Sequence, residues 1–424
     1  MHVKNGAGLV TEGRGIKYEK FLEIADTIVL VALVVWSLFT LWRASSFPGR
    51  PFGGDYGLNL EQTLQVIDLH TFPYGFVYPL PCILLRYFLF KAAGNYGGVI
   101  WVFSIALAFA FSVRFLLAEL YTGDGRVTYL YFLLAFLPVA YYIQLDMTML
   151  NCNLIVLSLV LLSMLCLKKE GWFLSGLFLS LGIALKLYPI VIVPYLLFRK
   201  KFRAAIFTLL WSAVFFVLIP VIALGSFCFI ELTGKWLQAV SSIGAPDFLV
   251  NLQAHKISMH YAILSLLAHG DPIHLSARGM YEAKRITFWL KLLVAGSGLI
   301  YLVFDLRKPC LKVESYHILF STVLVLSASL LFSDLLQPHH GVVLLGCSMI
   351  MVNAALNGSL PKFVRCLLLG VVFLPFVALR IASPGVQKVL AMNFHIVIYV
   401  LSLVFLRFYP KGCSQAQSLA SSTL

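Results

Sequence analysis

Charged residues are scarce in this chain, and their scarcity excludes a soluble enzyme. Of the 424 residues only 12% are charged and 60% are hydrophobic, whereas an ordinary soluble domain has about a quarter charged residues. Apolar runs of about 17 to 25 residues, the length that spans a bilayer core, recur between Phe21 and Arg407. The composition therefore predicts an all-α, polytopic membrane protein with about 12 transmembrane helices.

Paired cysteines and a clustered basic surface are also missing. The eight cysteines occur singly, without a CxxC motif, so we expect neither a disulfide framework nor a metal site. The net charge of +14 comes from bases that punctuate apolar segments, a pattern that sets membrane orientation and excludes a nucleic-acid partner. The first apolar run, Phe21 to Trp42, is too long for a cleaved signal peptide and is expected to remain as an anchor.

Basic residues at the ends of apolar segments predict the topology. Lys4, Arg14, Lys17 and Lys20 place the N-terminal tail in the cytoplasm. The expected organisation is a cytoplasmic tail at 1–20, one transmembrane domain at 21–408 with outer loops at 44–96 and 227–285, and a cytoplasmic tail at 409–424.

Two segments leave their membrane placement open. Val77 to Phe90 contains prolines and is interrupted by Arg86, with Lys91 just beyond; we expect an interfacial helix, and a full span is the alternative. Trp172 to Phe198 lies between two basic clusters and is expected to make two short crossings that turn at Lys186 to Pro189. The alternative is one long tilted helix with Lys186 snorkelling or paired inside the bundle.

This topology gathers ionisable residues at the outer ends of the helices. An ionisable group beside an apolar run is costly unless it has a partner or a function, so the cluster is typical of an active site or a transport pathway. The residues concerned are Asp55, Asp146, Lys186, Asp334, His339 and His340.

Structural roles are the alternative for most of these residues. Asp55 follows two glycines and is compatible with a turn. Asp146 is compatible with a cap for the helix that begins near Leu150. His339 and His340 follow a proline and are compatible with an interfacial position. Lys186 is harder to explain in this way, because a lone cation in a long apolar stretch should neutralise an anion.

The order of several short motifs resembles a known superfamily. After one transmembrane helix comes an outer loop with an early Asp, then Val77-Tyr78-Pro79-Leu80-Pro81, then Asn151-Cys152-Asn153 at a helix start, then Ala184-Leu185-Lys186-Leu187-Tyr188-Pro189. The chain resembles the GT-C integral-membrane glycosyltransferases. Within them it is most similar to glycosyltransferase family 87, the polyprenyl-phosphate-mannose-dependent α-mannosyltransferases.

The resemblance implies a specific reaction. A hexose, with mannose as first candidate, would pass with inversion from a polyprenyl-phosphate sugar to a hydroxyl of a lipid-linked or glycan acceptor, at the outer face of a bacterial inner membrane. The partners are then that donor, that acceptor and membrane lipids, with no cofactor beyond the donor. Asp55 matches the family's catalytic base. The expected substrate-binding residues are Lys186 at the phosphate, His339, His340, Asn151, Asn153, Asp146 and Tyr78.

Two other functions of a polytopic membrane protein compete with this interpretation. A transporter or flippase of lipid-linked saccharides predicts inverted repeats with paired broken helices, but residues 20–210 and 211–408 show no convincing self-similarity. An O-antigen ligase or polymerase should have a large, arginine-rich outer loop, and residues 227–285 contain only Arg278 and Arg285.

Overall fold

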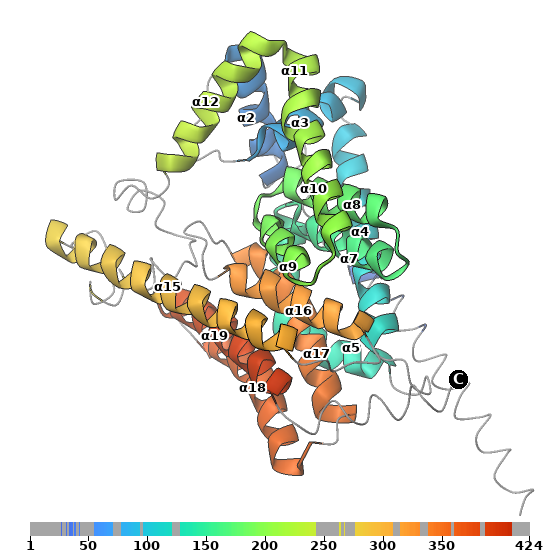
Figure 1. Cartoon of the computed structure of the whole chain (residues 1–424), viewed down its shortest axis with the longest axis vertical. Coiled ribbons are helices and arrows are strands. Elements are labelled where there is room, and N and C mark those ends of the chain that lie inside the picture. The colour runs from blue at the N-terminus through green and yellow to red at the C-terminus, as the bar shows by residue number, and fades with distance from the viewer. Residues whose placement is uncertain are drawn as a thin grey trace, which may run out of the picture.

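The computed structural model of the protein describes most of the predicted transmembrane domain. Its described ranges are 55–70, 78–93, 96–120, 128–242, 276–307, 314–330, 338–357, 360–381 and 386–408, with single positions between 27 and 42 and at 263 and 267. Every regular element in these ranges is helical (Figure 1). The all-α prediction is confirmed for this part of the chain. The two predicted tails lie outside the described residues.

Three helical stretches in the described ranges are long and apolar enough to cross a bilayer. They are Tyr96–Leu120, Tyr131–Thr148 and Phe202–Leu224. The first is helix α4 (Tyr96–Leu120), the second joins α5 (Thr128–Phe136) to α6 (Ala140–Thr148), and the third joins α10 (Phe202–Ala213) to α11 (Ile219–Leu224). Other apolar helices in the described ranges are shorter. The chain is thus a multi-pass membrane protein, and the count of about 12 spans stays a prediction.

Both composite spans contain a proline that alters the helix without ending it. Pro138 lies in a 3-10 turn, Leu137–Val139, between α5 and α6. Pro220 follows a π-helical segment, Val214–Leu218, that joins α10 to α11. A proline cannot donate to the preceding turn, and a local change of helical pitch accommodates it. Helix α6 continues to Thr148, so Asp146 lies within the helix.

The chain between residues 153 and 224 reverses direction three times. Its helices are α7 (Asn153–Lys168), α8 (Trp172–Leu185), the short α9 (Ile192–Phe198) after a 3-10 turn η2 (Tyr188–Val191), and then α10. Helix α8 ends at Leu185, and Lys186 adopts an extended backbone. This break confirms the predicted turn at Lys186 and excludes one continuous helix from Trp172 to Phe198.

Contacts between helices give their directions. Ser163 on α7 hydrogen-bonds Ser175 near the start of α8, which requires antiparallel helices because Ser163 lies toward the end of α7. On α8, Phe173 stacks edge-on against Phe207 of α10, and Ser180 bonds Ser212. Helices α8 and α10 are therefore parallel, and the chain returns through α9 between them.

A glycine permits the close approach of α8 and α10. A Cβ atom on Gly176 would lie 2.6 Å from the Phe207 Cβ and 2.7 Å from the backbone nitrogen of Thr208. Backbone atoms cannot move aside as a flexible side chain can. A side chain at position 176 would thus force the helices apart.

A second group packs α2 (Asp55–Leu69) and α3 (Leu80–Ala93) beside α12 (Ser226–Ser242). Val66, Ile83 and Leu232 are fully buried in their shared apolar cluster. The predicted helix at 77–90 begins later than expected, at Leu80. Prolines at the first turn explain this start, because their missing N–H groups would have no partner there.

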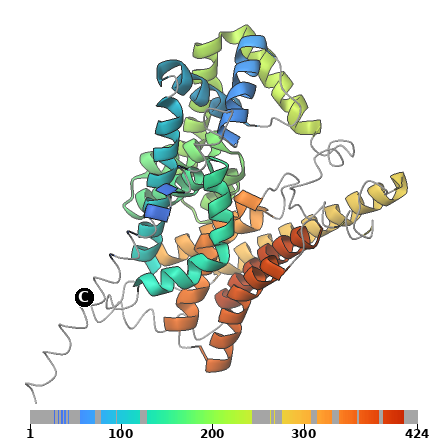
Figure 2. The same cartoon turned by 180° about the vertical axis from the view of Figure 1, so that it is seen from behind.

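The C-terminal helices lie together below α7–α10 in both views (Figures 1 and 2). They are α15 (Ala277–Arg307), α16 (Glu314–Ser329), the 3-10 segment η6 (Pro338–Val343), α17 (Leu344–Asn357), α18 (Lys362–Ile381) and α19 (Val386–Phe408). Segment η6 packs on α6 and α7. A Cβ on Gly341 would lie 2.6 Å from the Tyr142 ring, so the glycine lets η6 approach α6 closely.

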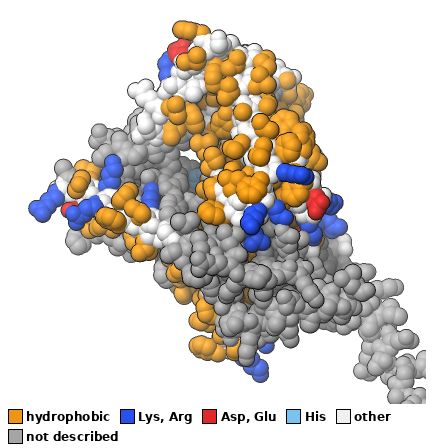
Figure 3. Space-filling model, in the orientation of Figure 1, with side chains coloured by type: hydrophobic (Ala, Val, Ile, Leu, Met, Phe, Trp, Pro, Cys, Tyr) orange, Lys and Arg blue, Asp and Glu red, His pale blue; other side chains and the backbone are white. Residues whose placement is uncertain are grey.

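The outer surface of α10–α12 is apolar. Ile206, Leu209, Leu218 and Ile222 are all more than half exposed. Figure 3 shows hydrophobic side chains over this face, with Lys and Arg side chains along its lower edge. Such a surface suits contact with lipid chains, as expected of membrane-spanning helices.

Candidate active site

Lys186 lies at the point where α8 ends, and its side chain is turned inward. Only 9% of the residue is exposed, and Nζ lies 3.0 Å from Nε2 of His340 in η6. A lysine ammonium can only donate, so Nε2 of His340 accepts this hydrogen bond. The structure thus brings together two predicted site residues that are 154 positions apart.

Tyr78 and Asn151 adjoin this pair. The ammonium of Lys186 lies 5.6 Å from the centroid of the Tyr78 ring, within range of a cation–π contact. The Tyr78 hydroxyl accepts a hydrogen bond of 3.2 Å from Nδ2 of Asn151. Four predicted residues, from the start of α3, from the α6–α7 turn, from the end of α8 and from η6, therefore meet at one end of the helices. We call this the Lys186 end.

Asp146 and Asn153 lie next to Asn151 and hold it in place. Asp146 is fully buried. Its Oδ1 accepts 2.7 Å from Nδ2 of Asn153, and its Oδ2 accepts 3.1 Å from the backbone N–H of Leu154. Asp146 thus caps α7, which is the structural alternative that the sequence left open. Nδ2 of Asn153 is also 3.3 Å from Oδ1 of Asn151, so the cap holds Asn151 toward Tyr78.

Sequence reasoning missed Arg86 as a site residue. The interfacial interpretation treated Arg86 and Lys91 alike, but Lys91 is exposed and Arg86 is only 1% exposed. The guanidinium carbon lies 4.3 Å from the Tyr78 ring centroid, on the ring that Lys186 also approaches. The signal was available, because Arg86, like Lys186, is a cation inside an apolar helix.

Tyr188 was not predicted as a site residue either. It follows Lys186 in the turn, and its ring lies edge-on to His340, with ring centroids 6.4 Å apart. Its hydroxyl is buried without a hydrogen-bond partner among the described residues. A buried, unsatisfied hydroxyl costs free energy that a bound ligand would recover.

The remaining predicted residues are not placed in full. Asp55 is the first residue of α2, and His339 is the second residue of η6, but their side chains lie outside the description. Asp334 lies outside the described residues altogether. Whether the carboxylate of Asp55 meets Lys186 therefore stays a prediction.

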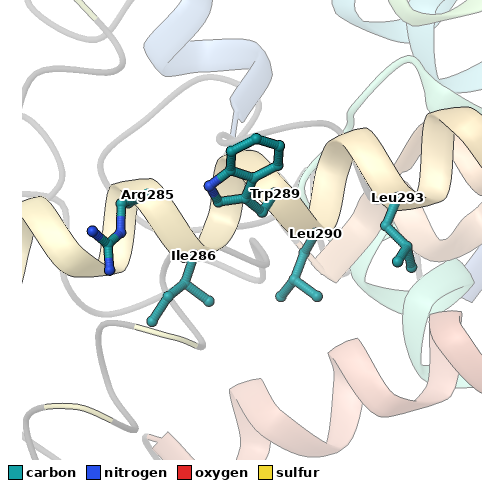
Figure 4. Close-up of a pocket in the computed structure, with 5 residues that line it drawn as sticks. All are labelled: Arg285, Ile286, Trp289, Leu290 and Leu293. Carbon is teal, nitrogen blue, oxygen red and sulfur yellow. The ribbon is translucent and has the colours of Figure 1, made fainter.

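Two other features of the described residues do not form a site. No three His, Cys, Asp or Glu side chains in the described ranges group closely enough to hold a metal ion. A hollow of about 600 Å³ is lined by residues of α15 alone. Figure 4 shows its five side chains spread along one helix without convergence. They are Arg285, Ile286, Trp289, Leu290 and Leu293.

The opposite end of the same helices contains ordinary surface charges. Lys168, at the end of α7, donates to both carboxylate oxygens of Glu119 at 3.0 and 3.1 Å. Lys201, before α10, lies over the Trp172 ring at 5.7 Å. Trp172 begins α8 and Lys201 precedes α10, as the parallel arrangement requires. We call this the Lys201 end.

The Lys186 end is suited to an anionic ligand. It combines two buried cations, a histidine, two asparagine amides and the N-terminus of α7, whose first N–H groups carry a partial positive charge. Charge attraction is stronger in such a buried environment than in water. The site could therefore hold a phosphate and the hydroxyl groups of a sugar.

Comparisons with known proteins give a family match and a structural match. The model of glycosyltransferase family 87 matches residues 76–334, more than half of the chain. Among solved structures, the crystal structure of ArnT from Cupriavidus metallidurans in the apo state is 15% identical, with a TM-score of 0.30, and the match covers 89% of this chain and 76% of that one. No curated protein matches the chain.

Proposed function

The chain belongs to glycosyltransferase family 87 and is thus a membrane glycosyltransferase with a lipid-linked donor; from this premise we propose its reaction and site. The donor is a polyprenyl-phosphate hexose, with mannose as the first candidate. The acceptor is a hydroxyl of a lipid-linked sugar or glycan, and transfer occurs with inversion at the outer face of a bacterial inner membrane. Both termini are then cytoplasmic.

One observation carries the proposal: Tyr78, Asn151, Lys186 and His340 meet at one end of the helices. The first three lie within the residues that match the family. Lys186 holds the donor phosphate, and His340 turns its Nε2 toward the Lys186 ammonium and steadies it. Asn151 and Tyr78 bind sugar or phosphate oxygens, while Asp146 and Asn153 position Asn151.

Asp55 is the proposed base. In an inverting transfer the acceptor oxygen attacks the sugar carbon as the bond to the phosphate oxygen breaks. One carboxylate that takes the acceptor proton is sufficient, because the phosphate leaves without needing a proton. Asp55 starts α2, and its assignment rests on its match to the early outer-loop Asp of the family. His339 is proposed to bind the substrate together with His340.

The test is transfer in membranes or nanodiscs supplied with polyprenyl-phosphate mannose, then with the glucose and galactose analogues. We expect Asp55→Asn to lower kcat by at least about 100-fold, the scale of general-base catalysis. Asp68→Asn is the matched control, because Asp68 is an exposed carboxylate on the same helix α2 and should keep its activity.

Two outcomes would contradict parts of this proposal. Near-normal transfer by Asp55→Asn would remove Asp55 as the base and leave the donor class standing. Failure of the wild-type protein to transfer any of these sugars, with movement of the donor across the bilayer instead, would favour a flippase.

A further inference from the structure

The guanidinium of Arg86 is buried without the partners that such a group needs. The residue is 1% exposed, and it lies inside the protein, so surrounding lipid cannot account for its burial. Nε, Nη1 and Nη2 all lack a hydrogen-bond acceptor among the described residues, and no described carboxylate pairs with it. A buried charge in this state is destabilising and is retained where it has a function.

Aromatic rings compensate only part of this cost. The Arg86 guanidinium carbon lies 4.3 Å from the Tyr78 ring centroid and 5.3 Å from that of Trp101. Trp101 is fixed by its own hydrogen bond of 2.9 Å to the Leu150 carbonyl. The two rings attract the cation through their π faces, but they leave the N–H groups without acceptors. These N–H groups are therefore available to an oxygen ligand.

Arg86 shares the Tyr78 ring with Lys186, whose Nζ lies 5.6 Å from the ring centroid. The carboxylate of Asp146, at the base of the site, is already engaged by Asn153 and Leu154. Asp146 offsets part of the positive charge of Lys186, but no described carboxylate pairs with Arg86, so the group keeps a net positive charge that an anion bound beside the Tyr78 ring would neutralise. An anion with two negative charges fits this pair better than one with a single charge.

We infer that Arg86 binds the leaving phosphate and stabilises the second negative charge that this phosphate acquires during transfer. The inference rests on the proposed function. In the donor the phosphate is a diester with one negative charge. When the bond between the sugar carbon and the phosphate oxygen breaks, its electron pair stays on that oxygen. The product, a polyprenyl phosphate monoester, has up to two negative charges, while the acceptor oxygen bonds the sugar carbon and its proton passes to the base.

The two cations then have different roles. Lys186 neutralises the charge that is present before the reaction, and Arg86 neutralises the charge that develops during it. An interaction that is stronger in the transition state than in the bound substrate raises kcat and leaves KM nearly unchanged. The planar, forked guanidinium suits this role, because it can donate two hydrogen bonds to two oxygens of one phosphate.

The experiment compares Arg86→Gln and Arg86→Lys with Lys91→Gln, a matched control on the same helix whose exposed ammonium lies over Tyr87 at 5.2 Å. It measures kcat and KM for polyprenyl-phosphate mannose, or whichever hexose donor the wild type uses, and inhibition by added polyprenyl phosphate, with uncharged polyprenol as the reference for the lipid tail.

For Arg86→Gln we expect kcat to fall by about 100-fold or more, KM to change by less than about threefold, and product inhibition to weaken by about tenfold or more. Arg86→Lys should be intermediate, and Lys91→Gln should match wild type.

Several other results would overturn the inference or the proposed function. Unchanged product inhibition in a folded Arg86→Gln protein would overturn the inference, as would a rise in KM with kcat preserved, which would assign Arg86 to the resting donor. If Arg86→Gln does not fold, Arg86→Lys decides, and its wild-type kcat and inhibition would overturn the inference. Wild-type protein that is inactive with all polyprenyl-phosphate hexoses would refute the proposed function itself.

Discussion

At the Lys186 end two buried cations, Arg86 and Lys186, lie near one aromatic ring. At the Lys201 end, Lys168 is exposed beside a carboxylate and Lys201 is half-buried beside a tryptophan. Lys186 is 9% exposed, while the Lys168 side chain is 46% exposed and pairs with Glu119. Lysines occur at both ends of the same helices α7 and α8, so the residue type alone does not distinguish a binding site from an ordinary surface. The difference lies in how each charge is paired. An exposed ion pair contributes little to stability, whereas a buried cation without a described acceptor, such as Arg86, indicates a ligand.

The largest expected effect comes from replacing one lysine by alanine at each end and comparing the KM of the two variants for the donor. We expect Lys186→Ala to raise the KM for the donor by about 10- to 100-fold, because a charge-assisted contact to phosphate is lost. Lys168→Ala should leave KM and kcat within about twofold of wild type. Steady-state kinetics with a polyprenyl-phosphate sugar measures both. Equal loss in the two variants would contradict the distinction.

The next largest expected effect tests whether Asp146 caps α7 beneath the Lys186 end. Asp146→Ala removes the cap of α7 and leaves the buried Asn153 amide and Leu154 N–H without their acceptors. We expect a loss of about 2–4 kcal/mol in stability, measured by thermal unfolding in detergent. Thr148→Ala is the control, because its hydroxyl only bonds carbonyls of its own helix. Similar melting temperatures for the two variants would show that Asp146 is no cap.

A smaller effect tests the close parallel packing of α8 against α10. Gly176→Ala places a methyl group against Phe207 at 2.6 Å and should destabilise the protein by about 1–3 kcal/mol. Gly182→Ala, on the same helix, meets its nearest neighbours at 3.8–3.9 Å, which is ordinary contact. It should be neutral or slightly stabilising, since alanine favours helix by about 1 kcal/mol over glycine. Chemical or thermal unfolding of both variants checks the expected opposite signs.

The smallest effect comes from a polar cluster between α2 and α12, which resembles the Lys201 end in its exposure. Lys235, at 2.6 Å, and His70, at 3.4 Å, hold the pKa of Glu231 below its ordinary value. Since this pKa is lower in the folded state, the stabilisation is present above the ordinary carboxylate pKa and is lost as pH falls through the lowered one. Glu231→Gln should lower Tm slightly at neutral pH and not at strongly acidic pH.

The control for this cluster is Glu282→Gln. It removes a pair with Arg285 that lies within α15 and joins no two helices, so its effect on Tm should be smaller still. A pH-independent effect of Glu231→Gln would contradict the assignment of the stabilisation to the Glu231 charge.

Sequence reasoning predicted the spans better than the site. The apolar runs predicted membrane-length helices, and α4 and the α10–α11 span are two of them, because uninterrupted apolar length is a direct signal. The turn at Lys186 was also predicted, from the two basic clusters that flank the segment. The role of Asp146 was left open between a helix cap and a site residue, and only the contacts with Asn153 and Leu154 show that its carboxylate caps α7.

The missed residues depend on contacts that no local pattern records. Arg86 and Lys91 lie five residues apart in one helix, and only the placement of Tyr78 and Trp101 on one side shows which of them is buried. The approach of His340 to Lys186 requires Gly341 to fit against Tyr142 of α6, a contact between segments far apart in the sequence. Motif order predicted that Lys186 and His340 belong to one site, and packing supplied Arg86 and Tyr188.

The most direct measurement is an experimental structure of the protein in a nanodisc with polyprenyl phosphate bound. The account predicts phosphate oxygens within about 3 Å of Lys186 Nζ and of an Arg86 nitrogen, and the Asp55 carboxylate on the side where the sugar would lie. A phosphate at the Lys201 end, or along α15 with Arg86 still lacking an acceptor, would contradict it.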